Sequence, residues 1–515
     1  MRFILKYLLP VLFSSVLAAQ ELQKPTEQWR PLFHFTPMQN WTNDPNGLIY
    51  QNGVFHLYNQ QNPFANSWGH MSWGHATSTD LVHWNHLPVA IPEKITGNDT
   101  VWRFSGSAVT DKANTSGLCK NDSCIIAIYT AHQPNIRKES QYISYSNDGG
   151  LTFSDYEKNP VIDLNKQDFR DPNVFWYEEG KYWLMTVVLP AEHKALFYRS
   201  DNLVSWSLLS EFGPQGYTGA NWECPFLVQL AVEGTEEKKW VLVISAAGGE
   251  RGVFEQYFIG DFDGKIFRNN NTPDMILPLD YGDTFYAAIP WNNIAGGKVI
   301  YLGWMIPNPQ PTYPWRGQMS IARDLSLRKT KAGIRLVQQP SSIVKQSVGK
   351  LSGARSVEVK NRVVDNNQFD IGASGVKGNS WWLTADISAG KNAKTGFKIA
   401  AAKGTNGQPS PETIISYDAA RHELTVDRRN SGGQLNEKAL RKTVALAPLD
   451  GKIHLEIILD KSSLELFANY GELSLTTFVF PPEQADKIYF FANEGSGTLS
   501  NLKLTDLSSV SFNDK

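Results

Sequence analysis

Three acidic residues of this 515-residue chain lie in local sequences that could support chemistry. Asp44 and Asp171 each begin an Asp-Pro-Asn triplet, and Glu223 is followed by a proline two positions later. A proline favours an extended conformation in the residue before it, which fixes the direction of each Asp side chain. The four residues from Asp44 would also make a good turn, because all their types favour turns. The repetition of the triplet at Asp171 favours a catalytic interpretation.

Converging carboxylates in an aromatic-rich chain are typical of glycoside hydrolysis. That reaction needs one carboxylate as nucleophile or base and one carboxylic acid to protonate the leaving oxygen. The acid must keep its proton near neutral pH, so its pKa has to be raised. We expect Arg170 to keep its neighbour Asp171 ionised, which leaves Glu223 as the better acid. Three Cys and ten His without an HExxH pattern indicate no metal site, and we expect no cofactor.

A repeated segment predicts how these residues are positioned. Residues 44–58 are echoed by 171–185, with Asp-Pro-Asn, a Tyr, a Gly and a Leu at the same offsets, and residues 81–84 are echoed by 203–206. Each copy is typical of a β-hairpin, and further strand pairs fit between and after the copies. The separation suits two propeller blades, because common blade repeats run to roughly 40–50 residues plus loops. The inner strands of a β-propeller line a central channel, so the three carboxylates would converge there. A β-sandwich with a recurrent hairpin is the alternative.

The rest of the chain divides into segments of different character. Residues 1–19 combine Arg2 and Lys6 with a short apolar run that ends in small residues, which predicts a signal peptide and a secreted protein. The repeat region spans residues 30–338, a polar linker spans 339–350, and alternating strands in 351–515 predict a β-sandwich. The sandwich could brace the propeller or form the contacts of a homo-oligomer. A net charge of −2 gives no basic field for nucleic acid, and no later stretch suits a membrane.

The cysteines and glycosylation motifs add smaller expectations. Cys119 and Cys124 bracket a polar loop and could pair after export, which would leave Cys224 unpaired in a core wall. Five Asn-x-Ser/Thr motifs begin at Asn40, Asn98, Asn114, Asn121 and Asn270. Asn40 lies four residues before Asp44, where a glycan would obstruct the site, so we expect it to be unmodified.

Six motifs, in order along the chain, resemble those of glycoside hydrolase family 32, the β-fructofuranosidases. They are Trp41-Thr42-Asn43-Asp44-Pro45-Asn46-Gly47, Phe104-Ser105-Gly106-Ser107, Phe169-Arg170-Asp171-Pro172, Trp222-Glu223-Cys224-Pro225, the stretch 280–287 and Pro314-Trp315-Arg316-Gly317. The resemblance implies an all-β chain with a five-bladed β-propeller followed by a C-terminal β-sandwich. It implies a secreted, retaining exo-β-fructosidase acting on fructose-containing oligo- and polysaccharides: inulin, levan and sucrose.

The resemblance also assigns roles to residues. Asp44 would be the nucleophile, Glu223 the acid/base and Asp171 the transition-state stabiliser. The terminal fructose would be bound by Asn43, Gln60, Trp68, Phe104, Ser105, Arg170 and Trp315. Without the motifs, packing within a sheet would be the simpler interpretation of both tryptophans, because Trp is mostly buried.

Three positions depart from the family pattern, and two other activities compete with hydrolysis. Thr42, the run Asn59-Gln60-Gln61 and Thr284 replace residues usual in the family, and we expect them to alter the pocket rim. A fructosyltransferase would use the same residues and pass the fructosyl group to a sugar. A non-catalytic sugar-binding propeller is a different class of answer, which the three intact carboxylates argue against, and an arabinan-type propeller hydrolase would lack the motif set.

Overall fold

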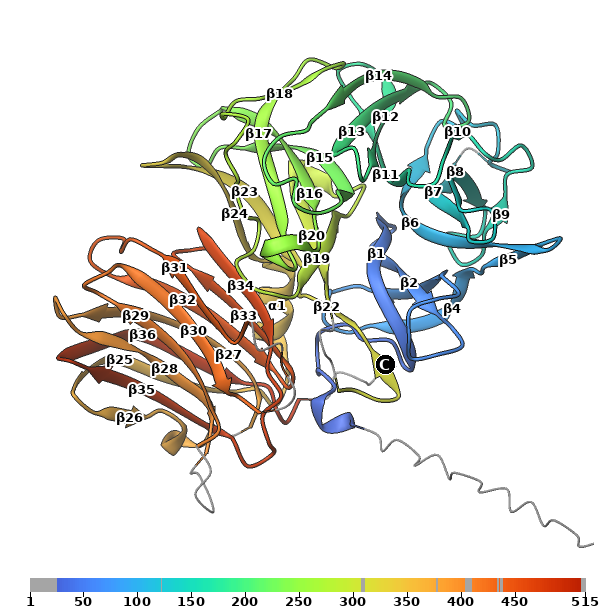
Figure 1. The fold of residues 1–515 in the computed structure, drawn as a ribbon. Coiled ribbons are helices and arrows are strands. Elements are labelled where there is room, and N and C mark those ends of the chain that lie inside the picture. The colour runs from blue at the N-terminus through green and yellow to red at the C-terminus, as the bar shows by residue number, and fades with distance from the viewer. Residues whose placement is uncertain are drawn as a thin grey trace, which may run out of the picture.

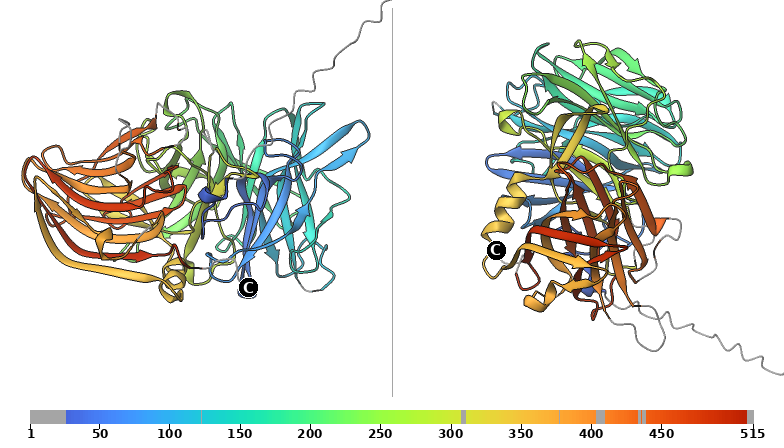
Figure 2. Two further views of the ribbon diagram at one scale, coloured as in Figure 1. Left: turned by 90° about the horizontal axis from the view of Figure 1, so that it is seen from below. Right: turned by 90° about the vertical axis from the view of Figure 1, so that its left-hand side faces the viewer.

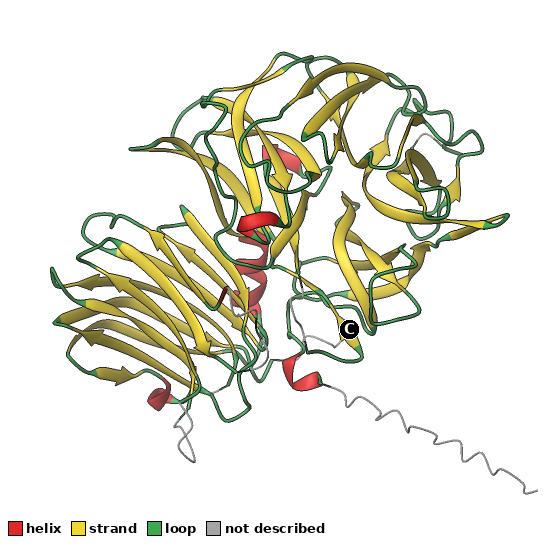
Figure 3. Ribbon diagram, in the orientation of Figure 1, coloured by secondary structure: helices red, strands yellow, loops and turns green. Residues whose placement is uncertain are grey.

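The computed structural model describes residues 26–510, apart from 122, 307–310, 377, 403–409, 433–434 and 436–438. The predicted signal peptide therefore lies outside the described residues. The described chain is all-β, with one α-helix, α1 (Ser342–Lys350), and four short 3-10 helices at Glu27–Trp29, Gly249–Arg251, Ala295–Gly297 and Gly372–Ser374 (Figure 3). None of the described helices is long and apolar enough to span a bilayer.

Residues 40–340 form five antiparallel sheets around a common centre, which we call the ring region (Figure 1). Sheet 1 contains β1 (Asn40–Gln51), β2 (Val54–Asn62), β3 (Ser72–Ser78) and β4 (Asn85–Ile91). Sheet 2 contains β5 (Lys94–Thr96), β6 (Asp99–Asp111), β7 (Cys124–Gln133), β8 (Lys138–Ser146), β9 (Ser154–Asp155) and β10 (Ile162–Lys166). Sheet 3 contains β11 (Arg170–Tyr177), β12 (Tyr182–Leu189), β13 (Lys194–Ser200) and β14 (Ser207–Phe212).

The last two sheets of the ring follow the same order from the centre outward. Sheet 4 contains β15 (Glu223–Ala231), β16 (Lys238–Ser245), β17 (Glu255–Phe262) and β18 (Phe267–Asn269). Sheet 5 contains β19 (Phe285–Pro290), β20 (Val299–Met305), β22 (Gln318–Met319), β23 (Arg323–Thr330) and β24 (Gly333–Pro340). The strands β1, β6, β11, β15 and β19 contact one another in a closed circle, so they line the centre. The two repeated segments are the hairpins β1–β2 and β11–β12, as predicted.

The ring closes on itself through a short parallel pair. Asn40 and Trp41 of β1 pair with β21 (Trp315–Arg316), so a strand from late in the region joins the sheet that begins it. Gly317 makes this approach close, because a Cβ there would stand 2.0 Å from the carbonyl oxygen of Thr42. Any larger side chain at this position would push the closing strand away from β1.

Apolar side chains fill the space between neighbouring sheets because strand residues alternate between the two faces. In β7, Ile125 packs toward sheet 1 whereas the next residue, Ile126, packs toward sheet 3. Separate buried clusters join sheets 3 and 4 and sheets 4 and 5, and another joins sheet 5 to sheet 1. These continuous apolar interfaces hold the five innermost strands, β1, β6, β11, β15 and β19, at fixed positions.

The second sequence echo is a turn with the same bonds in both copies. In sheet 1, the Asp80 carboxylate accepts hydrogen bonds from the Ser78 hydroxyl and from the amides of Val82 and His83. In sheet 3, Asn202 Oδ1 accepts the same set from Ser200, Val204 and Ser205. Leu81 and Leu203 have the same left-handed φ of 64°. The echo therefore encodes a side-chain-stapled turn.

Residues 355–506 form two six-stranded sheets, which we call the two-layer region. The first sheet has the order β25 (Arg355–Asp365), β36 (Ser496–Asp506), β27 (Ser380–Ala389), β32 (Ile453–Asp460), β33 (Ser463–Ala468) and β34 (Leu473–Phe478). The second has the order β26 (Gln368–Asp370), β35 (Lys487–Asn493), β28 (Lys394–Ala401), β29 (Glu412–Asp418), β30 (Glu423–Asn430) and β31 (Arg441–Ala445). One large apolar core lies between them. The alternating strands expected in this part of the chain are present in both sheets.

The two regions pack side by side and share a buried network of charges (Figure 2). His34 Nδ1 lies 2.8 Å from Asp460 and its Nε2 lies 2.9 Å from Glu465, with all three side chains fully buried. Arg323 of the ring pairs with the same Glu465 and with Asp280. Burial disfavours a charged imidazole, but the hydrogen bonds and charges of the two carboxylates outweigh it and raise the pKa of His34 to about 9. The helix α1 occupies most of the segment predicted as a polar linker.

Candidate active site

The pairing of each of the five innermost strands with its neighbour is irregular at the same end of the strand. The pairing register shifts between Thr42 and Pro45 in β1, and the equivalent shifts in the other four strands fall between Arg103 and Gly106, Arg170 and Asn173, Glu223 and Phe226, and Tyr286 and Ile289. A β-bulge bends its strand and re-aims side chains, and bulges are common beside active sites. Asp44, Ser105, Asp171 and Cys224 all lie inside these bulges, so the bulges turn them toward a common point.

Asp44 is held by side chains from three sheets. Its Oδ1 accepts a hydrogen bond of 3.0 Å from Asn43 Nδ2, and its Oδ2 accepts one of 2.6 Å from the Ser105 hydroxyl. The Cys224 thiol lies 3.6 Å from the same Oδ2. This carboxylate is therefore fixed in direction, as a nucleophile must be.

Asp171 is buried beside the same thiol. Its Oδ2 accepts a 2.9 Å hydrogen bond from the Cys224 amide and lies 3.7 Å from Cys224 Sγ. Its backbone has a left-handed φ of 66°, which is strained for a non-glycine residue and common at functional sites. Burial and the charge of Glu223 raise the pKa of Asp171 to about 8, although the charge of Arg170 opposes them. Burial therefore opposes the expected effect of Arg170, which on its own would keep Asp171 ionised.

Glu223 faces the other two carboxylates from the start of β15. Its Oε1 accepts from Arg170 Nε at 3.3 Å, and its Oε2 accepts a 2.5 Å hydrogen bond from the Tyr286 hydroxyl. Burial raises the pKa of Glu223, the Arg170 charge and the Tyr286 hydrogen bond oppose this, and the charge of Asp44 adds to it. A carboxyl with a raised pKa close to two other carboxylates suits a general acid.

Arg170 bridges Glu223 to a buried carboxylate that the sequence analysis missed. Its Nη1 donates to both oxygens of Glu139, at 2.9 and 2.8 Å, and to Asp168 at 2.9 Å. Glu139 also accepts from the Phe169 amide and lies 3.1 Å from His132 Nδ1. Tyr286 was missed as well, although it stands in the recognised stretch 280–287. Neither residue begins a repeated motif, so no signal in the repeat pointed to them.

The predicted sugar-binding residues fall into three groups. Asn43, Ser105 and Arg170 contact the carboxylates directly. The Trp68 side chain is 53% exposed, and its ring lies 6.0 Å from that of Phe104, the residue next to Ser105. Gln60 is buried and donates to the Arg103 carbonyl, and Trp315 is fully buried under the Arg30 guanidinium.

Two of the three sequence departures do not face a pocket rim. The Thr42 hydroxyl is buried within sheet 1, where it donates to Asn59 Oδ1 and to the Gln60 carbonyl. Thr284 donates to the Thr476 carbonyl in the two-layer region. Residues 280 and 283 likewise bind that region, through Thr476 and Arg428, so most of the stretch 280–287 joins the two regions. A cleft of about 640 Å³ lies along the same junction, away from the carboxylates.

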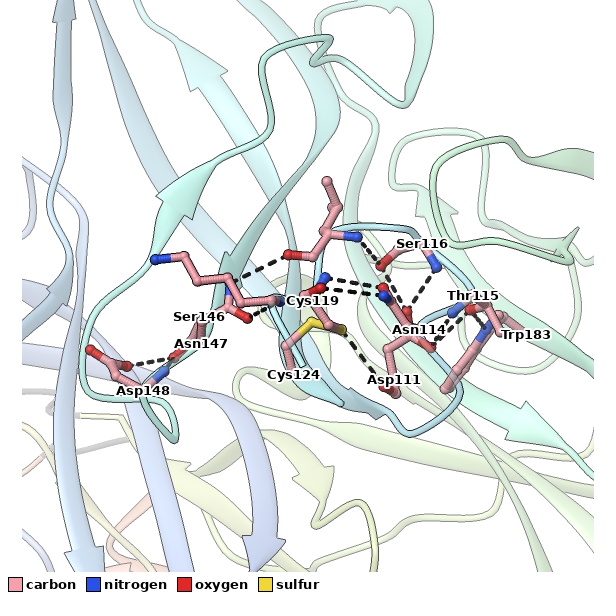
Figure 4. Close-up of a disulfide and its surroundings, with 12 residues drawn as sticks. Asp111, Asn114, Thr115, Ser116, Cys119, Cys124, Ser146, Asn147, Asp148 and Trp183 are labelled. Carbon is pink, nitrogen blue, oxygen red and sulfur yellow. Dashed lines mark hydrogen bonds between the residues drawn. A yellow bond between two sulfur atoms is a disulfide. The ribbon is translucent and has the colours of Figure 1, made fainter. Parts of the chain in front are cut away.

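The cysteine predictions are confirmed. Cys119 and Cys124 form a disulfide that closes a loop, which Asp111 also braces by accepting from the amides and hydroxyls of Thr115 and Ser116 (Figure 4). Cys224 is free and buried. The Asn40 side-chain amide donates to the Pro63 carbonyl at 2.7 Å, and its expected lack of a glycan stays a prediction.

Comparison with known proteins agrees with this geometry. Residues 34–340 match the family model for the glycosyl hydrolases family 32 N-terminal domain, and residues 347–506 match the model for the family 32 C terminal. The chain belongs to glycoside hydrolase family 32, and it is a glycoside hydrolase.

The similar proteins include enzymes named levanase, exo-inulinase and invertase. A levanase of Bacillus subtilis (strain 168) is 40% identical over 501 residues, which cover 94% of this chain and 71% of that protein. An extracellular exo-inulinase of Aspergillus awamori is 36% identical, covering 89% and 91%. An invertase of Schizosaccharomyces pombe is 33% identical, covering 93% and 85%.

Solved structures show the same likeness. The crystal structure of the Aspergillus awamori exo-inulinase superposes with a TM-score of 0.83 at 34% identity, covering 94% of this chain and 98% of that chain. The β-fructofuranosidase of Schwanniomyces occidentalis, solved with fructosyl-erythritol, superposes with a TM-score of 0.85 at 32% identity, covering 94% and 99%.

Proposed function

We propose that this protein is a retaining exo-β-fructosidase that releases terminal fructose from fructans and from sucrose. The observation that carries the proposal is the gathering of three carboxylates near Cys224 and Arg170, at or beside the bulges of the central strands β1, β11 and β15. The names of the relatives, levanase, exo-inulinase and invertase, supply the substrate class. We also propose that the five ring sheets are the blades of a β-propeller, that residues 351–515 are a sandwich domain, and that the protein is secreted.

The reaction would proceed in two steps. An Asp44 oxygen attacks the anomeric carbon of the terminal fructosyl unit, the bond from that carbon to the leaving oxygen breaks, and Glu223 gives its proton to that oxygen. Glu223 then takes a proton from water, the water oxygen bonds to the anomeric carbon, and Asp44 leaves. Retention follows from two displacements at one carbon.

Asp171 would change its protonation when the sugar binds. Hydroxyl groups that donate to a carboxylate favour its ionised form and so lower its pKa. A fructosyl unit that donates hydrogen bonds to Asp171 would favour its ionised form, and Glu223, whose pKa is raised by burial, would carry the proton that the first step needs. The ionised Asp171 would then stabilise positive charge on the ring in the transition state. Asn43, Ser105, Trp68 and Phe104 would line the sugar, and Gln60 and Trp315 would support the pocket wall.

The product profile tests this function. Purified protein should release fructose without early oligosaccharides from inulin and levan, and fructose together with glucose from sucrose, all without added metal. Early oligosaccharides from the polymers would indicate internal cleavage, and lengthening products from sucrose would indicate a fructosyltransferase. Sugar binding without any product would indicate a non-catalytic propeller.

Replacement of the nucleophile gives a matched inactive control. Asp44→Asn should fold with an unchanged circular dichroism spectrum and lose turnover by several orders of magnitude, because an amide cannot attack the anomeric carbon. Hydrolysis of sucrose by this variant at the parent rate would exclude Asp44 as the nucleophile.

A further inference from the structure

Six aromatic rings form a continuous row along one side of the active site. Phe64, Trp68 and His70 come from the loop between β2 and β3, Trp102 and Phe104 come from β6, and His132 comes from β7. Successive ring centroids lie 4.4 to 6.0 Å apart: His132 on Phe104, Phe104 by Trp68, Trp68 by Trp102, Trp102 by His70, and His70 by Phe64. Trp102 also lies 5.8 Å from His132 and 6.4 Å from Phe104, so it joins the inner rings to the outer ones. We call this row the aromatic ledge.

The inner end of the ledge touches the catalytic residues. Phe104 precedes Ser105, whose hydroxyl holds Asp44. His132 stacks face to face on Phe104, with 4° between the planes, and its Nδ1 lies 3.1 Å from the Glu139 that holds Arg170. The position of the inner rings is therefore tied to both sides of the site.

The outer end of the ledge is open to solvent. Phe104 and Trp102 are partly buried, whereas Trp68 is 53% exposed and Phe64 is 68% exposed. Single exposed apolar residues are ordinary, but a connected row that leads out of an active site marks a binding surface. Aromatic rings pack well against flat, partly apolar surfaces such as the C–H faces of sugars.

We propose that the aromatic ledge binds the sugar units beyond the scissile bond, so that it selects long fructan chains over sucrose. This inference rests on the proposed function. Because the carboxylates would hold the terminal fructosyl unit, the rest of the chain must extend away from them, and the exposed rings of the ledge continue outward from Phe104, the residue next to Ser105. Phe64, His70 and Trp102 bind the outer units.

The test compares substrates that differ in length. In Phe64→Ala and Trp102→Ala, the ratio of kcat/KM on inulin to that on sucrose should fall about five- to tenfold, as expected for the loss of one aromatic contact. The loss should appear mainly as a higher KM for inulin. Trp102→Phe, which keeps a ring, should retain most of the ratio.

Trp176→Ala is the matched control, because Trp176 is a partly exposed indole six residues along β11 from Arg170. In this variant the ratio of kcat/KM on inulin to that on sucrose should stay within about twofold of the parent value. An unchanged ratio in both ledge variants would overturn the proposal. So would a changed molecular mass of Phe64→Ala in solution, because the row would then be a contact between copies of the chain.

A failure of the proposed function would look different. If the parent protein releases no fructose from either substrate, the function fails, and the ledge is then tested by binding alone. Titration calorimetry with inulin should show weaker binding to Phe64→Ala and Trp102→Ala than to the parent and to Trp176→Ala. Equal binding by all four proteins would overturn the ledge.

Discussion

At the residue scale, the active site depends on contacts that cross from one strand to the next. Cys224 donates its amide to Asp171 and places its thiol near Asp44, so one residue spaces two carboxylates. Arg170 and Tyr286 both bind Glu223. The motifs in the sequence identified the carboxylates, but not Glu139 or Tyr286, because those two act through a neighbour and begin no repeat.

The acid role of Glu223 predicts a dependence on the leaving group. Glu223→Gln should hydrolyse sucrose far more slowly than the parent, because the amide cannot protonate the departing oxygen. Substrates with good leaving groups need little protonation, so their first step should be largely rescued. Burst-phase kinetics on an aryl fructoside would measure this step, and equal losses on good and poor leaving groups would remove Glu223 from the acid role.

The Tyr286 hydroxyl predicts a shift of the pH profile. Its hydrogen bond stabilises the ionised form of Glu223 and so lowers the pKa of that carboxyl. Tyr286→Phe should therefore raise the pKa of Glu223, keep it protonated to higher pH, and move the basic limb of kcat/KM upward. A basic limb that stays in place or moves to lower pH would contradict this.

At the element scale, the repeats predicted more of the fold than of its local detail. The hairpins at 44–58 and 171–185 are confirmed. The sequence could predict them because their alternating apolar residues fill the spaces between sheets. The bulges that aim Asp44, Asp171 and Glu223 carry no apolar pattern, so only the Asp-Pro and Cys-Pro pairs hinted at them. Thr42 and Thr284 were expected at a pocket rim, but one is buried within a sheet and the other joins the two regions.

The repeated turn predicts a measurable loss of stability. Asn202→Ala removes the acceptor for the Val204 and Ser205 amides, which should cost about 1–2 kcal/mol of unfolding free energy. Thermal unfolding would show a lower midpoint with fructosidase activity retained below it. Asp201→Ala is the control, because the Asp201 side chain lies next to Asn202, is 72% exposed and, within the described residues, forms an ion pair with Arg199 alone. Equal effects of the two changes would contradict the role of the turn.

At the scale of the whole molecule, a buried charge network joins the two regions into one unit. The network consists of His34, Arg323, Asp280, Asp460 and Glu465. Their side chains are at most 3% exposed, so solvent cannot replace a partner that is lost. Removing one member of a buried pair leaves an unpaired charge and is strongly destabilising. The motifs could not predict this network, since its members are spread over more than 400 positions.

The pKa of His34 predicts how stability depends on pH. Because the folded pKa is about 9 and the ordinary value is 6.5, the charged imidazole stabilises the fold fully below pH 6.5, and this contribution is lost as pH rises through 9. His34→Gln should lower the unfolding midpoint most at pH 6, and the gap to the parent should narrow toward pH 9.5. A gap that does not change with pH would contradict a charged His34.

The closing strand β21 bears on when this enzyme becomes active during its synthesis. Asp44 is synthesised early, but β1 cannot pair with Trp315 and Arg316 until those residues have been made. Glu223 likewise cannot accept its hydrogen bond from Tyr286 until that residue has been made. The partners of His34, Asp460 and Glu465, are synthesised later still, more than 420 positions along the chain. An unfinished chain therefore lacks contacts that position Asp44 and Glu223, and we expect hydrolytic competence only after these later segments have been synthesised.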